Sequence, residues 1–223
     1  MNQFVRTVEA ARSLTLPWLL AAVLVLALDV IQPRYPQELA QTLIRMGRLY
    51  LMAGFAYTAW SRMAGRTEEP LLQRFFVRSL WLFLFYFVMN VAVNIAGSVV
   101  AMVFPMLGQA GATLGLILLT LAQQLILFYF LAAAAGLEFA ESIQGMRPLF
   151  RRTRAWALAL VLANPGLPLL SGFLLSGMDQ GVQLQGAIAA TGVQHLVVLF
   201  VLMGLIRVRT DMDDENPAGD TDG

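Results

Sequence analysis

Polar side chains inside long apolar runs are the residues of this chain whose types and spacing could best carry chemistry. Such groups are costly in a membrane and usually face other helices or a water-filled path. We identify a candidate mid-membrane cluster by counting from the ends of the runs. It comprises Asn90, Asn94, Gln123, Gln124, Asn164, Gln194 and His195.

Two interpretations of this cluster stay open. Asn90 and Asn94 lie on one helix face, which Gly97 and Ala101 continue. Small residues and amides on one face are typical of a close contact between helices in a membrane. The same amides could instead line a path for a solute or an ion. By the same count, no Asp or Glu lies at this depth, which counts against a proton-coupled carrier.

His195 is the only histidine in the chain. A histidine can change its charge near neutral pH, although hydrogen-bonded structural roles are more common. An intramembrane hydrolase could use Ser171 as nucleophile and His195 as base, provided that the two lie within hydrogen-bond reach. However, Leu169 stands where a Gly-x-Ser-Gly motif requires glycine.

No other catalytic motif is found. The sequence contains no Walker loop, dinucleotide fingerprint or H-E-x-x-H zinc motif. Cysteine is absent, which excludes disulfides, thiolate metal sites and thiol catalysis. We therefore predict no catalytic residue, no cofactor and no metal site.

The elements that must position these residues are membrane-spanning helices. The chain has 223 residues, of which 58% are hydrophobic and only 13% charged. The apolar residues gather in runs of about twenty, the length that crosses a bilayer as a helix. We predict an all-α polytopic membrane protein, a bundle of six transmembrane helices with short amphipathic interfacial segments. The predicted spans are about 14–31, 39–60, 79–104, 111–135, 155–176 and 187–206, in one domain covering residues 1–210. An acidic tail, 211–223, is predicted to be disordered.

Two of the predicted spans are irregular. The second contains Arg45 and Arg48, which could extend to the headgroups, form a buried functional pair, or pair with Asp29 at the same end of the first span. The fifth is interrupted by Asn164-Pro165 and Pro168. Such a break can build a binding site in a transporter, or it can be a kink whose carbonyls are satisfied by neighbouring helices.

Arginine placement predicts the orientation. Most of the basic residues fall in the N-terminus, the two long loops and the start of the tail. By the positive-inside rule, both termini are cytoplasmic in a bacterial inner membrane. Anionic lipid headgroups are the nearest partners for the loop arginines, and we expect no nucleic-acid partner. The candidate lipid contacts are Arg74, Arg78, Arg147, Arg151, Arg152 and Arg154.

The layout also resembles a known group of proteins. A weak second span ends in LMAGFAYTAW, and the fourth span is followed by LEFAESIQGMRPLFRRTRAW. In these features the chain is similar to the YciC-type bacterial inner-membrane proteins and their six-span relatives. The resemblance implies a six-span membrane protein of uncharacterised function and assigns no catalytic residues.

Three functions are consistent with these observations. The leading hypothesis is a non-enzymatic membrane protein that acts through lipids or other membrane proteins. The alternative is a small transporter or channel component that uses the mid-membrane polar residues and the broken fifth helix. A water-accessible cavity lined by Asn90, Asn94, Asn164 and His195 would favour this alternative, whereas a dry, filled interior would exclude it. The remote third possibility is the intramembrane hydrolase.

Overall fold

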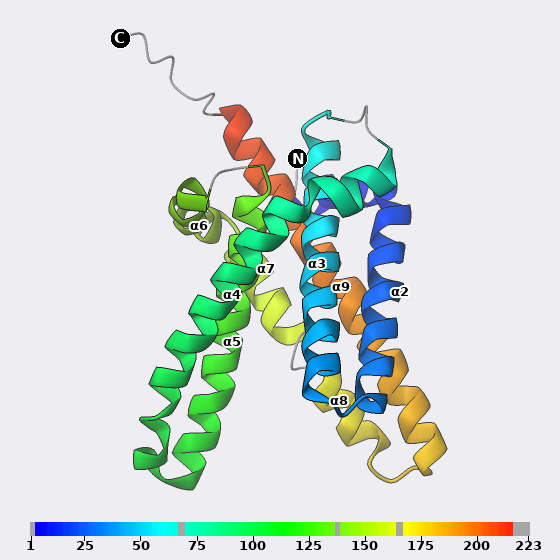
Figure 1. The fold of residues 1–223 in the computed structure, drawn as a ribbon, viewed down its shortest axis with the longest axis vertical. Helices are drawn as coiled ribbons and strands as arrows, with labels where there is room; N and C mark the ends of the chain where they lie inside the picture. The colour runs from blue at the N-terminus through cyan, green and yellow to red at the C-terminus, as the bar shows by residue number, and fades with distance from the viewer. Residues whose placement is uncertain (1–2, 67–69, 137–138, 164–166, 216–223) are drawn as a thin grey trace.

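The computed structural model describes the chain except for residues 1–2, 67–69, 137–138, 164–166 and 216–223 (Figure 1). Every regular element in the described residues is a helix, which confirms the all-α prediction. The α-helices are α1 (Gln3–Ser13), α2 (Thr15–Ile31), α3 (Glu38–Met63), α4 (Leu80–Ala101), α5 (Gly108–Ala134), α6 (Phe139–Arg152), α7 (Arg154–Val161), α8 (Leu167–Leu175) and α9 (Gln180–Glu215). Three short helical segments join them: η1 (Gln32–Arg34), η2 (Gln73–Arg78) and η3 (Phe104–Leu107).

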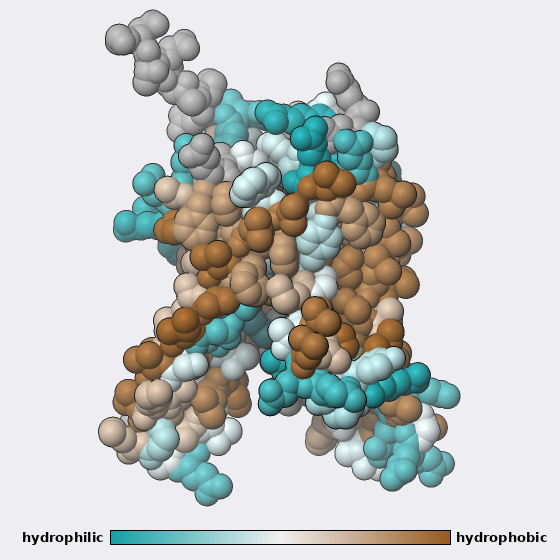
Figure 2. Space-filling view, in the orientation of Figure 1, coloured by the Kyte–Doolittle hydropathy of each residue, from teal (hydrophilic) through white to brown (hydrophobic). Residues whose placement is uncertain are grey.

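In the described part of the chain, four segments are long and apolar enough to cross a membrane. They are Thr15–Arg34, Gln73–Met106, Gly108–Ala134 and Gln180–Glu215, which cover the predicted first, third, fourth and sixth spans to within one residue. Figure 2 shows a broad hydrophobic band between two hydrophilic ends. Large apolar side chains such as Val23 and Ile95, each 61% exposed, lie on the outer faces of these helices. An apolar surface of this extent is expected where lipid is the solvent.

The predicted second and fifth spans are helical, but neither is among these four segments. The second is long but contains charged residues, and the fifth is divided into short helices. α3 has 26 residues, yet Arg45, Arg48 and Arg62 interrupt its apolar character. The fifth span consists of two short helices, α7 and α8, which are separated in the chain by residues 162–166. Asn164 and Pro165, where we predicted the break, lie outside the described residues.

The core of the molecule lies where α3, α5 and α9 meet. Its buried residues include 53–56 of α3, 127–134 of α5 and 201–206 of α9. Alanine and glycine allow these backbones to approach closely. A Cβ added to Gly54, for example, would lie 2.6 Å from the carbonyl oxygen of Phe75 in η2.

The helices form two limbs that join at this core. α2, α3 and α9 pack together, while α4 and α5 form a hairpin that contacts α3 and α9. The hairpin diverges from the other limb toward the end opposite α1 (Figure 1). With side chains included, a notch remains between the lower parts of the two limbs (Figure 2).

The end of the molecule that carries α1 is rich in charge, and we call it the arginine-rich end (Arg6, Arg12, Arg62, Arg152 and Arg207). There α9 continues as a helix to Glu215, so residues 211–215 of the predicted tail are helical.

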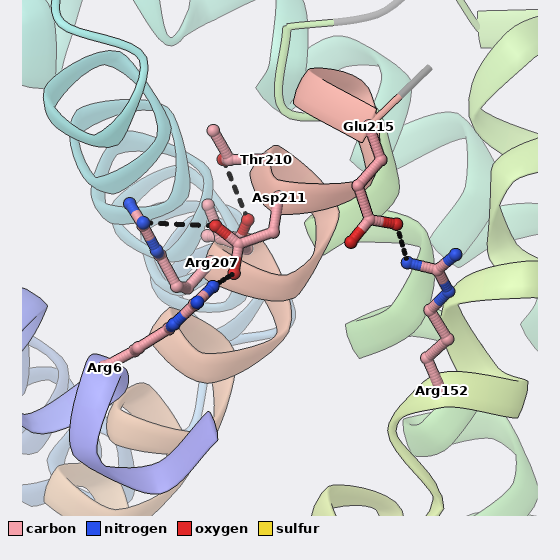
Figure 3. Close-up of polar contacts among 7 residues, drawn as sticks. Arg6, Arg152, Arg207, Thr210, Asp211 and Glu215 are labelled. Atoms are coloured by element: carbon pink, nitrogen blue, oxygen red, sulfur yellow. Dashed lines mark hydrogen bonds and ion pairs between the residues drawn. The ribbon is translucent and has the colours of Figure 1, made fainter. Parts of the chain in front are cut away.

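Ion pairs hold this extension of α9. Asp211 lies 3.0 Å from Arg6 of α1 and 3.1 Å from Arg207, and Glu215 lies 2.7 Å from Arg152 of α6 (Figure 3). These contacts tie the end of α9 to two helices that are distant in sequence.

Candidate functional site

A polar cavity of about 300 Å³ lies between the α4–α5 hairpin and helices α2, α3 and α9. Its volume falls at the lower end of the range of small-molecule sites. The polar lining comprises Arg45, Arg48, Tyr86, Asn90, Gln124, Gln194 and His195. The apolar lining comprises Val25, Leu49, Met52, Leu127, Phe128 and Val198.

A carboxylate, Asp29 of α2, joins two of the polar lining residues. Its Oδ2 lies 2.5 Å from Nε2 of His195 on α9, and its Oδ1 lies 2.9 Å from Nη1 of Arg48 on α3. The side chains of Asp29 and His195 are only 19% and 13% exposed. Both carboxylate oxygens are therefore engaged, and three helices meet at one charged network, the Asp29–Arg48–His195 network.

The position of this network follows from the lengths of α2 and α9. Asp29 is 14 residues beyond Thr15, the first residue of α2, or about 21 Å along the helix, and two residues before Ile31, the last. His195 is 12 residues before Arg207 of the arginine-rich end, or about 18 Å, and lies in the middle part of α9. The network is therefore far from the arginine-rich end and close to the opposite end of α2.

The sequence-based count placed His195 near mid-membrane and found no carboxylate at that depth, but it did not foresee the contact of His195 with Asp29. It assigned Asp29 to the end of the first span and considered that helix alone. α2 packs along α9, and this places Asp29 level with His195 although the two are 166 residues apart in sequence.

The pairing of Arg48 with Asp29, one of three alternatives for the arginines of the second span, is confirmed. Arg45 lines the same cavity nearly one helical turn earlier, and no hydrogen bond or ion pair joins it to the described part of the chain. Two guanidinium groups and one carboxylate give the site a net charge of +1 before His195 is counted. Such a charge acts strongly where water is scarce. The cavity is therefore attractive to an anion.

The predicted polar cluster is divided by the structure. Four of its members share the cavity: Asn90, Gln124, Gln194 and His195. Asn94 and Gln123 are not among the lining residues, and Asn164 lies outside the described residues. Of the four residues expected to line a transporter cavity, Asn90 and His195 line this one.

Gln123, one of the remaining amides, joins the two helices of the α4–α5 hairpin. It donates a hydrogen bond from Nε2 to the carbonyl oxygen of Val93 at 3.2 Å, and a Cβ on Gly97 would overlap this Gln123 side chain. Asn94 is exposed, and its hydrogen bond from Nδ2 to Oδ1 of Asn90 at 2.9 Å stays within α4. The contact of Gln123 with Gly97 fits the interpretation as a helix contact made by an amide and a small residue, whereas the bond of Asn94 does not join two helices.

Ser171 and His195, the pair that the hydrolase hypothesis requires, contribute to different sites. Ser171 lines a separate pocket between α8 and α9, together with Ser176 and Thr191. The hydrogen bond that His195 makes within the described residues goes to Asp29. Across those residues, no group of three or more His, Cys, Asp or Glu side chains gathers to hold a metal ion.

The candidate lipid contacts also differ in their surroundings. Arg74 is 4% exposed, and Arg152 is paired with Glu215. Arg147 of α6 is exposed and lines an apolar groove of about 550 Å³ between α4, α5 and α6. Arg78, Arg151 and Arg154 are exposed at the surface.

Sequence reasoning missed Tyr86 and the contact between Asp29 and His195. A usable signal existed, because Asp29 is the only acidic residue inside any of the six predicted spans. A lone acid and a lone histidine, each in an apolar run, are expected to find partners.

Comparison with protein-family models finds no match. Comparisons with curated proteins and with solved structures find no match either. The resemblance to the YciC-type proteins therefore stays a prediction.

Proposed function

We propose that this protein is a carrier of the inner membrane that binds a small anion in the cavity between the two limbs. The observation that carries the proposal is the polar, positively charged lining at the depth of the Asp29–Arg48–His195 network. In this proposal six segments cross the membrane, and the arginine-rich end with both termini faces the cytoplasm.

The arrangement of α3 supports its role as the second crossing segment. Its 26 residues extend about 39 Å, enough to span the hydrocarbon core. The cations of a membrane span are tolerated where they face a cavity or a partner instead of lipid. Arg45 and Arg48 both line the cavity, and Arg48 is paired with Asp29. In our proposal α7 and α8 together form the fifth crossing segment, as a broken helix.

The donors in the lining support an anion as the ligand. Guanidinium groups donate several hydrogen bonds and match the shape of a carboxylate or an oxyanion. The amides of Asn90, Gln124 and Gln194 and the hydroxyl of Tyr86 supply further polar groups around the same space. A volume near 300 Å³ and a net charge of +1 favour a small monoanion, such as a short carboxylate or an inorganic oxyanion.

The shape of the molecule supports access from one side. Figure 2 shows a notch between the lower parts of the two limbs, with hydrophilic surface at its inner end. In the proposed orientation this notch opens away from the cytoplasm. A site open to one side is what a carrier requires in one of its two states.

Binding of nitrate and of acetate to the purified protein in mild detergent tests the proposal by calorimetry. We expect binding that Arg45→Gln weakens at least about tenfold, because the substitution removes a charged donor. Arg34→Gln, in η1 and outside the lining, is the matched control and leaves the affinity unchanged. If the unaltered protein binds neither anion, or if the two variants behave alike, the cavity is not an anion site. Uptake of the bound anion by proteoliposomes then separates a carrier from a receptor.

A further inference from the structure

The anion site and the Asp29–His195 contact share one cation. Arg48 lines the cavity and also forms an ion pair with Asp29 through Nη1 and Oδ1. A bound anion that contacts Arg48 therefore competes with Asp29 for the same guanidinium. The remaining partner of Asp29 in the network is His195, at its other oxygen.

This competition changes the charge balance of the site. The empty cavity has a net charge of +1, and a monoanion reduces it to zero. The positive charge of Arg48 at Oδ1 of Asp29 is then partly neutralised by the anion. A partly buried carboxylate without a compensating cation is unfavourable. A proton on the Asp29–His195 pair restores the +1 charge and supplies a cation at Oδ2.

Few other groups of the site can take this proton. The charged and titratable side chains that face the pair are Arg45 and Arg48 from α3 and Tyr86 from α4, and α5 contributes the amide of Gln124. The two arginines are already protonated, and a neutral tyrosine hydroxyl is not a proton acceptor near pH 7. An imidazole paired with a carboxylate is the natural acceptor in this pH range.

We propose that the Asp29–His195 pair takes up one proton each time an anion binds at Arg48, so that the carrier moves anion and proton together. The proton comes from water in the notch and binds at Nδ1 of His195, because Nε2–H of the neutral imidazole already donates to Oδ2 of Asp29. It is released when the anion leaves and Arg48 returns to Asp29. This inference rests on the proposed function, and it adds the co-substrate and the residues that hold it.

Nitrate is the probe of choice, because it is the anion of a strong acid and carries no proton itself near neutral pH. Calorimetric titration in buffers of different ionisation heat measures the protons taken up. We expect about one proton per nitrate. If one proton accompanies each nitrate, the affinity falls by up to about tenfold for each pH unit of increase over the range in which the empty site lacks that proton.

Two substitutions locate the proton. Asp29→Asn and His195→Gln both remove the uptake, and Asp29→Asn binds nitrate at least as tightly as the unaltered protein because Arg48 has lost its competitor. Asp179→Asn, at an exposed position between α8 and α9, is the matched control and keeps the uptake. Elution as a single species in size-exclusion chromatography shows that a variant is folded. If one of the two variants does not fold, the proton uptake of the other one decides the question.

The outcomes separate the two proposals. Nitrate binding without proton uptake, or uptake that persists in both variants, overturns the coupling and leaves the anion site standing. Failure of nitrate and acetate alike to bind at any pH instead overturns the proposed function. Uptake that disappears in the Asp29 and His195 variants while nitrate still binds supports both.

Discussion

Arg48 has both a structural and a proposed functional role in the cavity. Arg48 lines the cavity, and its Nη1 lies 2.9 Å from Oδ1 of Asp29. The Arg48 side chain is 38% exposed. Arg48→Gln leaves the carboxylate with His195 alone. We expect a loss of about 1–3 kcal/mol in the free energy of unfolding, between the values for a surface ion pair and for a fully buried one. Unfolding of the variant in a detergent series measures this loss.

A double-mutant cycle with Asp29→Asn is the control for this prediction. The double variant should lose less than the sum of the two single losses, because the second change removes the carboxylate that the first left poorly compensated. Strict additivity would show that Arg48 and Asp29 do not interact.

Gly54 is the residue on which the contact between α3 and η2 depends. A Cβ at this position would lie 2.6 Å from the backbone oxygen of Phe75, which cannot rotate away. We expect Gly54→Ala to lower the free energy of unfolding by about 1–3 kcal/mol, as overpacking of a core does. Thermal unfolding measures the change.

Gly47→Ala on the same helix is the comparison for this substitution. Its nearest neighbour is the side-chain atom Cδ1 of Leu28 at 3.4 Å, and alanine favours the helix. An equal loss in both variants would contradict the role of the close approach at Gly54.

At this scale the sequence predicts the types of contact better than the partners. The Arg48–Asp29 pair was one alternative, because both residues lie at the same end of successive spans. The Asp29–His195 contact depends on the packing of α2 against α9, which periodicity within a single helix does not reveal. No feature of the sequence distinguishes the amides of Asn94 and Gln123 from the amides that line the cavity.

Among the helices, α6 borders an apolar groove to which the structure assigns no ligand. Its apolar side chains Ile143 and Phe150 line one wall of the groove, and Arg147 lies beside them. No hydrogen bond or ion pair joins Arg147 to the residues that the structure describes. An acyl chain in the groove with its phosphate at Arg147 would suit both the apolar walls and the charge.

Native mass spectrometry with added anionic phospholipid tests this interpretation of α6. We expect Arg147→Gln to retain fewer bound lipids than the unaltered protein, since the substitution removes the cation at the groove. Arg151→Gln, exposed on the same helix but outside the groove, is the control and should retain them. Equal retention by the two variants would count against a specific lipid site.

The long apolar helices could be predicted in full, and the shorter or charged ones only in part. α2, α4, α5 and α9 follow from unbroken apolar runs, since no other structure satisfies their backbone groups in lipid. α6 lies within what the sequence presents as a charged loop. The extension of α9 to Glu215 depends on Arg6 and Arg152, which are distant in the chain.

At the scale of the whole molecule, the two limbs create the cavity. The α4–α5 hairpin meets the rest of the structure at a core near the arginine-rich end and diverges beyond it (Figure 1). The break in the fifth predicted span could be anticipated from its prolines, although only four of the six predicted spans lie in described segments long and apolar enough to cross a membrane. The divergence of the hairpin could not be anticipated from the sequence, because it depends on which faces of α3, α4, α5 and α9 pack against one another.

The central claim is that water and anions reach the cavity from the side opposite the arginine-rich end. The chain has no cysteine, so Asn90→Cys places a single thiol in the lining. Val88→Cys, two residues away on α4, is the control, because Val88 is 54% exposed on the apolar surface and should face lipid. Labelling by a membrane-impermeant, anionic thiol reagent added outside intact cells is the measurement. The account predicts rapid labelling of the Asn90→Cys variant, slowed by nitrate, and none of the Val88→Cys variant; resistance of both thiols to the reagent would contradict it.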